Sequence, residues 1–218
     1  MKNKFIAAGI FALAFVLLIV LVCTWNVESI GPEDTSIGLS SLNKAAHDAL
    51  GSNQLWYDVT EIFGYLAIAT VGAFGLLGVY QAFKRKSLLK VDKKLFALCG
   101  LFALMAVAYV AFEVIVINYR PVIMPGDAHV EASFPSSHTM LVCVIMGGAS
   151  VALGDYVKSK GLRIGLRTAC IAVAAVTAVG RLLSGVHWLT DIVGGVLISL
   201  ALVTLYAATC DAFDSKKE

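Results

Sequence analysis

Six long apolar runs divide this 218-residue sequence and constrain its fold more than any other feature. Hydrophobic residues make up 59% of the chain and charged residues only 15%, and the mean hydropathy is +0.83. A helix of about 20 apolar residues spans a bilayer and pairs its own backbone polar groups. The sequence therefore predicts an all-α integral membrane protein, a single domain over residues 1–218 with six transmembrane helices.

The predicted spans are 5–27, 61–83, 95–117, 140–157, 168–179 and 192–209. The first run is longer than the apolar region of a signal peptide, which has about 7–15 residues, so we expect an uncleaved span. Residues 28–60 are polar and predict an extracytoplasmic loop with a short interfacial helix around 42–50. Residues 211–218 predict a cytoplasmic tail.

Positive residues gather on one side of this arrangement. The N-terminus, the basic segments 84–94 and 158–167 and the tail hold 14 of the 17 Lys and Arg residues. The positive-inside rule places these segments and both termini in the cytoplasm. Lys44, Arg120 and Arg181 remain on the other side. Because basic runs of this kind are ordinary cytoplasmic anchors, we predict no binding of nucleic acid.

Small and aromatic residues give further expectations about packing. Gly72, Gly75 and Gly78 recur at every third residue and predict the close approach of a neighbouring helix. The Ala-rich run 168–179 is expected at the centre of the bundle. The five cysteines are odd in number and lack metal-ligand spacing, so no disulfide framework is indicated. All three tryptophans fall at predicted outer span ends, as an interfacial belt would: Trp25, Trp56 and Trp188.

A short polar stretch at residues 180–191 separates the last two apolar runs. Arg181 precedes His187 by six residues, and Asp191 follows it by four. If a helix begins near His187, this step places the carboxylate and the imidazole on one face. Asp191 can then accept a hydrogen bond from one ring nitrogen and leave the other free as a nucleophile. Since Arg181 offers a planar fork of donors to phosphate oxygens, the stretch indicates phosphoryl transfer.

A second polar stretch, F-P-S-S-H-T at residues 134–139, directly precedes an apolar run. The proline, Ser136 and Ser137 favour the start of a helix. A helix that begins here directs free N–H groups and the positive end of its dipole toward an anion. His138, in the first turn, is placed to give a proton to a leaving oxygen. Upstream, Arg120 and a proline close the preceding apolar run.

In order and spacing, these stretches resemble the type 2 phosphatidic acid phosphatase (PAP2) superfamily of integral-membrane lipid phosphatases, which shares its core with vanadium haloperoxidases. The motifs of that family are K-x6-R-P, P-S-G-H and S-R-x5-H-x3-D. Here they read Glu113-x6-Arg120-Pro121, Pro135-Ser136-Ser137-His138 and Gly180-Arg181-x5-His187-x3-Asp191. The resemblance covers residues 113–191 by motif and the whole chain by the number of spans.

Three positions depart from the family pattern. Ser137 replaces a glycine, and Gly180 replaces a serine whose hydroxyl would help to hold phosphate. Glu113 replaces a lysine, which removes one positive charge from the expected phosphate site and adds a negative one. If the third span stays helical to Arg120, Glu113 lies roughly 10 Å deeper along the axis. A carboxylate there is costly, so we expect it to pair with Arg120 or Arg181 or to weaken anion binding.

The resemblance implies a mechanism that uses no cofactor and no metal. Phosphate would be held by the N–H groups that open the fourth span and by Arg120, Arg181, Ser136 and Ser137. His187, oriented by Asp191, would attack phosphorus and form a phosphohistidine. His138 would protonate the leaving group and then serve as the base that activates water.

Two other groups of polar residues could be mistaken for functional sites. Asp127, His129 and Glu131 alternate in a polar loop, but we expect no metal there because the resembled chemistry uses none. His47 lies in the 28–60 loop and is expected to be a solvated or interfacial histidine.

The predicted site faces the outside of the cell membrane at headgroup depth, so the expected partner is a membrane lipid phosphate. Undecaprenyl diphosphate, phosphatidylglycerol phosphate and phosphatidic acid are the candidates. The alternatives are a catalytically weak lipid-binding or transport protein on the same fold, a lipid phosphotransferase, and an oxidative enzyme of the haloperoxidase branch. The sequence leaves the oligomeric state open.

Overall fold

Six helices are long and apolar enough to cross a membrane in the computed structural model, which describes residues 2–124 and 126–215. They are α1 (Lys2–Thr24), α3 (Gln54–Arg85), α4 (Lys93–Val114), α5 (Ser137–Tyr156), α6 (Lys160–Leu183) and α7 (Leu189–Asp214). Each contains a long apolar stretch, for which a helix is the favoured structure in lipid. The prediction of an all-α bundle with six candidate spans is confirmed.

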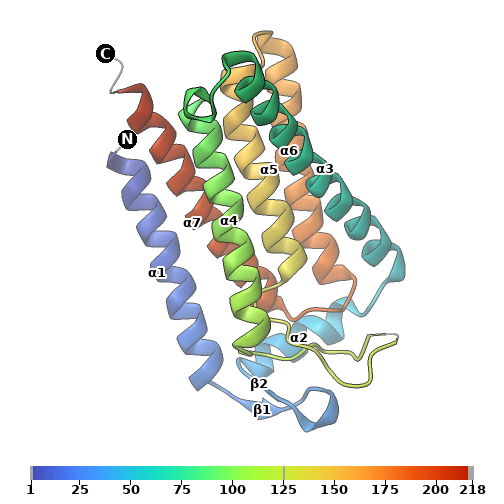
Figure 1. Ribbon diagram of the computed structural model, residues 1–218. Coiled ribbons are helices and arrows are strands. Elements are labelled where there is room, and N and C mark those ends of the chain that lie inside the picture. The colour runs from blue at the N-terminus through green and yellow to red at the C-terminus, as the bar shows by residue number, and fades with distance from the viewer. Residues whose placement is uncertain (1, 125, 216–218) are drawn as a thin grey trace.

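Successive spans run in opposite directions, so both termini lie at one end of the bundle (Figure 1). At the other end lie α2 (Ser40–Leu50) and a two-stranded antiparallel sheet. The sheet pairs β1 (Glu28–Ser29) with β2 (Ser36–Ile37) around the 3-10 helix η1 (Pro32–Asp34). The short helix predicted around 42–50 is confirmed, with a start two residues earlier.

Two predicted loops are partly helical. α3 begins at Gln54, so the end of the predicted loop 28–60 belongs to the second span. α6 begins at Lys160, so most of the predicted basic loop 158–167 is helix. Lys and Arg are good helix formers, and their long stems let the charged heads reach the membrane surface. Charge therefore marks the end of a span in the membrane without marking the end of its helix.

Two helix ends also differ from the prediction. α4 ends at Val114, three residues before the predicted end of the third span. α7 continues to Asp214 and takes in the first part of the predicted tail 211–218, whose last three residues lie outside those described. The turn between α3 and α4 holds a second 3-10 helix, η2 (Leu88–Lys90).

α5, rather than α6, is the central helix of the bundle. Half of the most apolar 18-residue window of α5 is buried, against 6% for α6. A Cβ atom at Gly147 would lie 2.8 Å from Val203, and one at Gly148 would lie 2.7 Å from Leu101. These two glycines thus allow α7 and α4 to approach α5 closely. The expectation that the Ala-rich run of α6 fills the centre is wrong, because more than half of the residues 168–179 are exposed.

The glycine repeat of α3 does not contact another helix as predicted. A Cβ atom at Gly72 or Gly75 would meet nothing within 4 Å among the described residues, and one at Gly78 would make only ordinary contact with Leu95. On the same helix, a Cβ atom at Gly64 would lie 3.2 Å from Nε2 of His138. On α3, Gly64 rather than the repeat at 72–78 is therefore the glycine in close contact with another helix, and it lies beside His138.

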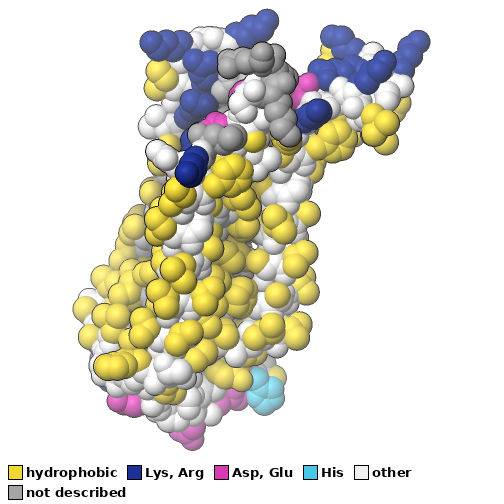
Figure 2. Space-filling model, turned by 90° about the vertical axis from the view of Figure 1, so that its left-hand side faces the viewer, with side chains coloured by type: hydrophobic (Ala, Val, Ile, Leu, Met, Phe, Trp, Pro, Cys, Tyr) yellow, Lys and Arg dark blue, Asp and Glu magenta, His cyan; other side chains and the backbone are white. Residues whose placement is uncertain are grey.

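The surface divides by polarity along the axis of the bundle. Apolar side chains cover its sides, and Lys and Arg side chains gather at one end (Figure 2). That end carries both chain termini and the turns that precede α4 and α6, where the basic segments lie (Figure 1). The five cysteines are free, and two of them, Cys23 and Cys99, are exposed on the sides of spans.

Candidate active site

A cavity of about 720 Å³ opens where α3 and α5 begin and α4 and α6 end. Five of the eight predicted site residues line it: Glu113, Arg120, Ser137, His138 and Arg181. The other three, Ser136, His187 and Asp191, are at most 2% exposed. The fold thus brings together residues from three separate motifs, with the predicted nucleophile in the protein layer that supports the cavity.

The loop between α6 and α7 holds His187 in that layer. A helix begins near His187 as predicted, because α7 starts at Leu189. Oδ2 of Asp191 accepts a hydrogen bond from the backbone N–H of Trp188 at 2.9 Å and lies 3.6 Å from Nδ1 of His187. The second distance exceeds that of a hydrogen bond. Asp191 therefore caps the start of α7 through a hydrogen bond, while its carboxylate lies beside the imidazole without bonding to it.

His187 is a buried, neutral imidazole. Burial lowers the pKa of His187 well below its usual value, and the positive charges of Arg120 and Arg181 lower it further. A backbone hydrogen bond to Ser133 raises the pKa, but by less than burial lowers it. A neutral ring with a free nitrogen lone pair is the form that a nucleophilic histidine needs.

The start of α5 joins the second motif to the third. Ser136 is the N-cap residue, and its hydroxyl accepts a hydrogen bond from the N–H of Thr139 at 3.4 Å. The N–H of Ser136 donates to the carbonyl of Asp191 at 3.0 Å. Because both groups have protein partners, the predicted phosphate contact of Ser136 stays a prediction. Ser137 and His138 line the cavity directly after this cap.

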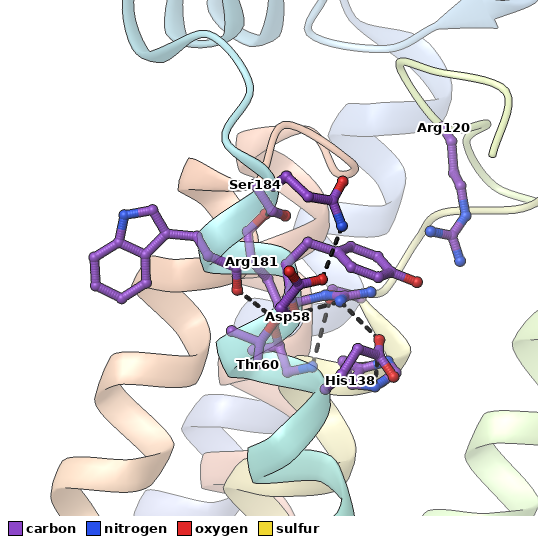
Figure 3. Close-up of polar contacts among 12 residues, drawn as sticks. Asp58, Thr60, Arg120, His138, Arg181 and Ser184 are labelled. Carbon is purple, nitrogen blue, oxygen red and sulfur yellow. Dashed lines mark hydrogen bonds and ion pairs between the residues drawn. The ribbon is translucent and has the colours of Figure 1, made fainter. Parts of the chain in front are cut away.

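A carboxylate that the motifs do not include lies beside Arg181 and His138. Oε1 of Glu61, in the second turn of α3, lies 3.1 Å from Nη1 of Arg181 and 3.1 Å from Nε2 of His138. The guanidinium also donates to the hydroxyl of Thr60 at 3.3 Å and lies over the ring of Tyr57, 4.9 Å from its centroid. Figure 3 shows Arg181, Thr60 and His138 gathered in one cluster.

Arg120 lies apart from that cluster, across the close-up from Arg181 (Figure 3). Its Nε atom is 3.3 Å from Oε2 of Glu131, and its backbone N–H donates to the carbonyl of the same residue. The two arginines thus face the cavity from different elements, one from α6 and one from the segment between α4 and α5. Such a pair is suited to grip an anion from two directions.

The prediction for Glu113 needs correction. Because α4 ends at Val114, the chain is not helical to Arg120, and the depth estimated from a continuous helix does not apply. Among the described residues, the ion pairs of Arg120 and Arg181 run to Glu131 and Glu61 and not to Glu113. Glu113 lines the cavity as an exposed side chain instead.

Gly180 has a packing role that explains its departure from the family pattern. A Cβ atom at this position would lie 2.7 Å from Cγ2 of Thr60 and 3.1 Å from Cε3 of Trp56. Position 180 therefore faces α3, and a serine there would press on α3 before its hydroxyl could serve an anion. The absence of a serine hydroxyl at position 180 thus goes together with a close contact between α6 and α3.

Buried amides that the sequence did not single out hold the site together. Asn43 of α2 accepts from the N–H of Thr190 at 3.1 Å and donates to the Thr190 hydroxyl at 3.0 Å, which ties α2 to the start of α7. Asn118 accepts from the N–H of Gly38 at 3.2 Å. Trp188 donates to the carbonyl of Tyr119 at 2.7 Å and is 4% exposed, so it is not part of an interfacial belt.

His129 and His47, the two histidines outside the motifs, both have protein partners. His129 lies 2.9 Å from Glu33, while Glu131 pairs with Arg120, so two side chains of the alternating trio have separate partners. No group of three or more metal-ligating side chains occurs within residues 2–124 and 126–215. His47 is half-buried against the ring of Trp188, with centroids 5.5 Å apart, so it is not a solvated loop histidine.

One protein-family model matches part of this chain. The PAP2 superfamily model matches residues 115–213, which hold Arg120 and the second and third motifs. The resemblance stated from the motifs is confirmed over this segment. No curated protein matches the sequence significantly.

Two crystal structures of membrane proteins share the fold. The transmembrane PAP2-type phosphatidylglycerolphosphate phosphatase from Bacillus subtilis aligns over 97% of this chain and 98% of its own, with a TM-score of 0.65 and 19% identity. LpxE from Aquifex aeolicus aligns over 78% of this chain and 94% of its own, with a TM-score of 0.50 and 18% identity. At these identities the comparison shows the fold, and the chemistry has to be argued from the site.

Proposed function

Since this chain carries a PAP2-superfamily core over residues 115–213, we propose that it is an integral-membrane phosphatase of a lipid phosphate or diphosphate. The observation that carries the proposal is the constellation around one cavity. Arg120, Arg181 and His138 line the cavity, and His187 is buried beside them as a neutral ring that feels their charges. Phosphoryl transfer by histidine requires hydrogen-bond donors that hold the phosphate, a proton donor and a nucleophile, and these residues can supply all three.

In the proposed first step, the two guanidinium groups and the N–H groups at the start of α5 hold the phosphate. Nδ1 of His187 faces Asp191, so Nε2 carries the lone pair that attacks phosphorus. A nitrogen–phosphorus bond forms as the bond from phosphorus to the leaving oxygen breaks. His138 gives its proton to that oxygen, which departs as an alcohol or a phosphate.

In the proposed second step, His138 is neutral and accepts a proton from water. The resulting hydroxide equivalent attacks the phosphohistidine, the nitrogen–phosphorus bond breaks, and inorganic phosphate leaves. His187 returns to its neutral form. Positioning and charge stabilisation contribute most of the rate in such transfers, which fits a site built from donors already fixed by packing.

Charge and composition support a location at the outer face of the cell membrane. Basic residues gather at the end with the termini, and cytoplasmic segments carry such an excess (Figure 2). The cavity lies where α5 begins, at the opposite end of the bundle (Figure 1). The proposed site therefore faces the outside of the cell.

A lipid substrate is favoured by the walls of the cavity. Tyr65 and Ile68 of α3 and Leu141 of α5 line the cavity and provide an apolar surface beside the polar side chains. Undecaprenyl diphosphate, phosphatidylglycerol phosphate and phosphatidic acid all join an apolar chain to a phosphate.

The decisive experiment measures phosphate release from these three lipids by the purified protein in detergent. We expect His187→Ala to lower kcat at least about 10³-fold, as loss of a nucleophile does. His138→Ala should cost about 10²–10⁴-fold, as loss of a general acid does. The matched control is His129→Ala, an exposed histidine that pairs with Glu33 outside the cavity lining.

Unchanged phosphate release in His187→Ala would contradict the proposal and favour the lipid-binding or transport alternative. A phosphohistidine should be trapped on the wild type by rapid acid-free quenching and be absent from His187→Ala. Release of lipid alcohol without free phosphate, together with a new phosphorylated acceptor, would instead identify a phosphotransferase.

A further inference from the structure

The side chain of Glu61 lies between Arg181, a predicted phosphate ligand, and His138, the predicted proton donor. One carboxylate oxygen, Oε1, is within 3.1 Å of both Nη1 of Arg181 and Nε2 of His138. The Glu61 side chain is 28% exposed and lines the cavity, whereas the Arg181 side chain is 2% exposed. The carboxylate therefore reaches from the wall of the cavity to a cation that is otherwise enclosed by protein.

A buried guanidinium needs an anion beside it, because an unpaired buried charge costs several kcal/mol. Thr60 and Tyr57 give Arg181 a hydroxyl and an aromatic face but no negative charge. Among the described residues, Glu61 is the carboxylate that forms an ion pair with Arg181. Carboxylate and phosphate oxygens use the same donors in the same geometry, so the two anions compete for Arg181.

We infer that Glu61 is a built-in placeholder anion, which holds Arg181 and His138 in position and is displaced from Arg181 by the phosphate of the substrate. The inference rests on the proposed phosphate site. Glu61 keeps its contact with His138 after displacement, where its charge stabilises the imidazolium that must donate a proton. Glu61 is thus a positioning residue that lowers phosphate affinity while it supports the proton donor.

The rest of the cavity is consistent with this role. Three further carboxylates, on Glu113, Asp127 and Glu131, line the cavity with the two arginines. Arg120 is paired with Glu131 in the same way that Arg181 is paired with Glu61. Phosphate therefore enters a site in which each arginine already holds a carboxylate, and binding is an exchange of anions.

The test compares Glu61→Gln with Asp58→Asn by titrating inorganic phosphate into the purified proteins in a calorimeter at fixed pH and ionic strength. Asp58 lies three residues earlier on α3 and accepts a hydrogen bond from Gln54 at 2.8 Å; Gln54 lines the cavity, but Asp58 itself does not. Both variants remove one negative charge from the same helix end. We expect Glu61→Gln to tighten phosphate binding about tenfold. Asp58→Asn should change the dissociation constant less than twofold.

Turnover gives a second readout that a purely structural residue would not produce. We expect Glu61→Gln to lower kcat for a lipid phosphate about tenfold or more without raising KM, because phosphate binds better while His138 loses its partner. Glu61→Asp keeps the charge but shortens the side chain, so it should give intermediate phosphate binding. It also serves if Glu61→Gln does not fold.

Phosphate binding that is unchanged or weaker in both Glu61 variants would overturn the inference and leave Glu61 as a fixed counter-ion of Arg181. Equal tightening in Asp58→Asn would overturn it as well, because a general charge effect would then suffice. The calorimetric result does not depend on turnover. A tenfold gain in a protein that hydrolyses none of the lipids would therefore support the placeholder and contradict the proposed phosphatase.

Discussion

At the residue scale, burial decides the chemical form of His187. An exposed histidine titrates near pH 6.5, but the ring of His187 is 2% exposed and lies near two arginines. Its charged form is therefore disfavoured, as the proposed role of nucleophile requires. The same physical cause makes the folded protein sensitive to acid, because the unfolded chain can bind a proton at this residue and the folded chain resists it.

We expect stability to fall below pH 6.5 for this reason. Above pH 6.5 the ring is neutral in both states, so His187 contributes no pH dependence. Between pH 6.5 and the lowered pKa of the folded state, the unfolded state binds the extra proton. The free energy of unfolding should then fall by up to about 1.4 kcal/mol for each pH unit. Denaturant unfolding in detergent from pH 7.5 to pH 5 measures this slope.

The variant His187→Asn should show a shallower dependence over the same range. His129→Asn, at a side chain that is 83% exposed, is the control and should keep the slope of the wild type. Equal slopes in His187→Asn and wild type would show that the buried ring does not resist protonation.

At the element scale, the contact between α3 and α6 sets the identity of a motif residue. The motif that the sequence resembles has serine at position 180, but Thr60 and Trp56 of α3 leave no space for a Cβ atom here, which explains the glycine. The same close approach brings Glu61 and Thr60 to the guanidinium of Arg181. A change that restores the family motif would therefore disturb the packing that positions the site.

Gly180→Ser should destabilise the protein by about 1–3 kcal/mol, the usual cost of overpacking, although serine is the better helix former. The unfolding midpoint in denaturant measures the loss. Gly75→Ser is the matched control on a helix position where a Cβ atom meets nothing within 4 Å. Adding Thr60→Ser, which removes the Cγ2 atom that lies closest, should recover part of the loss. A stable Gly180→Ser protein with unaltered unfolding would contradict the packing explanation.

At the scale of the whole molecule, the basic side chains and the candidate site lie at opposite ends of the bundle. Lys and Arg side chains lie at the end with the termini, and the cavity lies at the other (Figures 1 and 2). A membrane with a positive-inside bias would orient such a molecule with its site outward. The orientation is a property of the sum of many charges, and no single residue determines it.

Labelling of single cysteines tests this orientation. In a protein whose five cysteines are replaced, Ala128→Cys places a thiol in the loop beside the cavity and Lys86→Cys places one in the turn after α3. We expect a membrane-impermeant maleimide to label Ala128→Cys on intact cells and Lys86→Cys only after permeabilisation. The reverse pattern would place the site in the cytoplasm and contradict the proposed topology.

The sequence by itself determined the class of the fold and most of the predicted site. Apolar run length predicts spans because the bilayer fixes how many residues a helix needs. Motif spacing selected Arg120, His138, Arg181 and His187 as candidates, and the structure places the first three on the cavity lining. Local signals also placed the starts of α5 and α7. These features depend on neighbours in the chain, so they can be read along the chain.

Only the tertiary structure decided which elements meet. The ion pairs of Glu61 join residues 77 and 120 positions apart, and the hydrogen bonds of Asn43 cross 147 positions. A carboxylate at the start of an apolar run was a visible signal for Glu61, but its partners were not. The roles of Gly180 and Trp188 likewise follow from the packing of one helix on another. Contacts between distant segments depend on how the spans are arranged, which one-dimensional spacing does not encode.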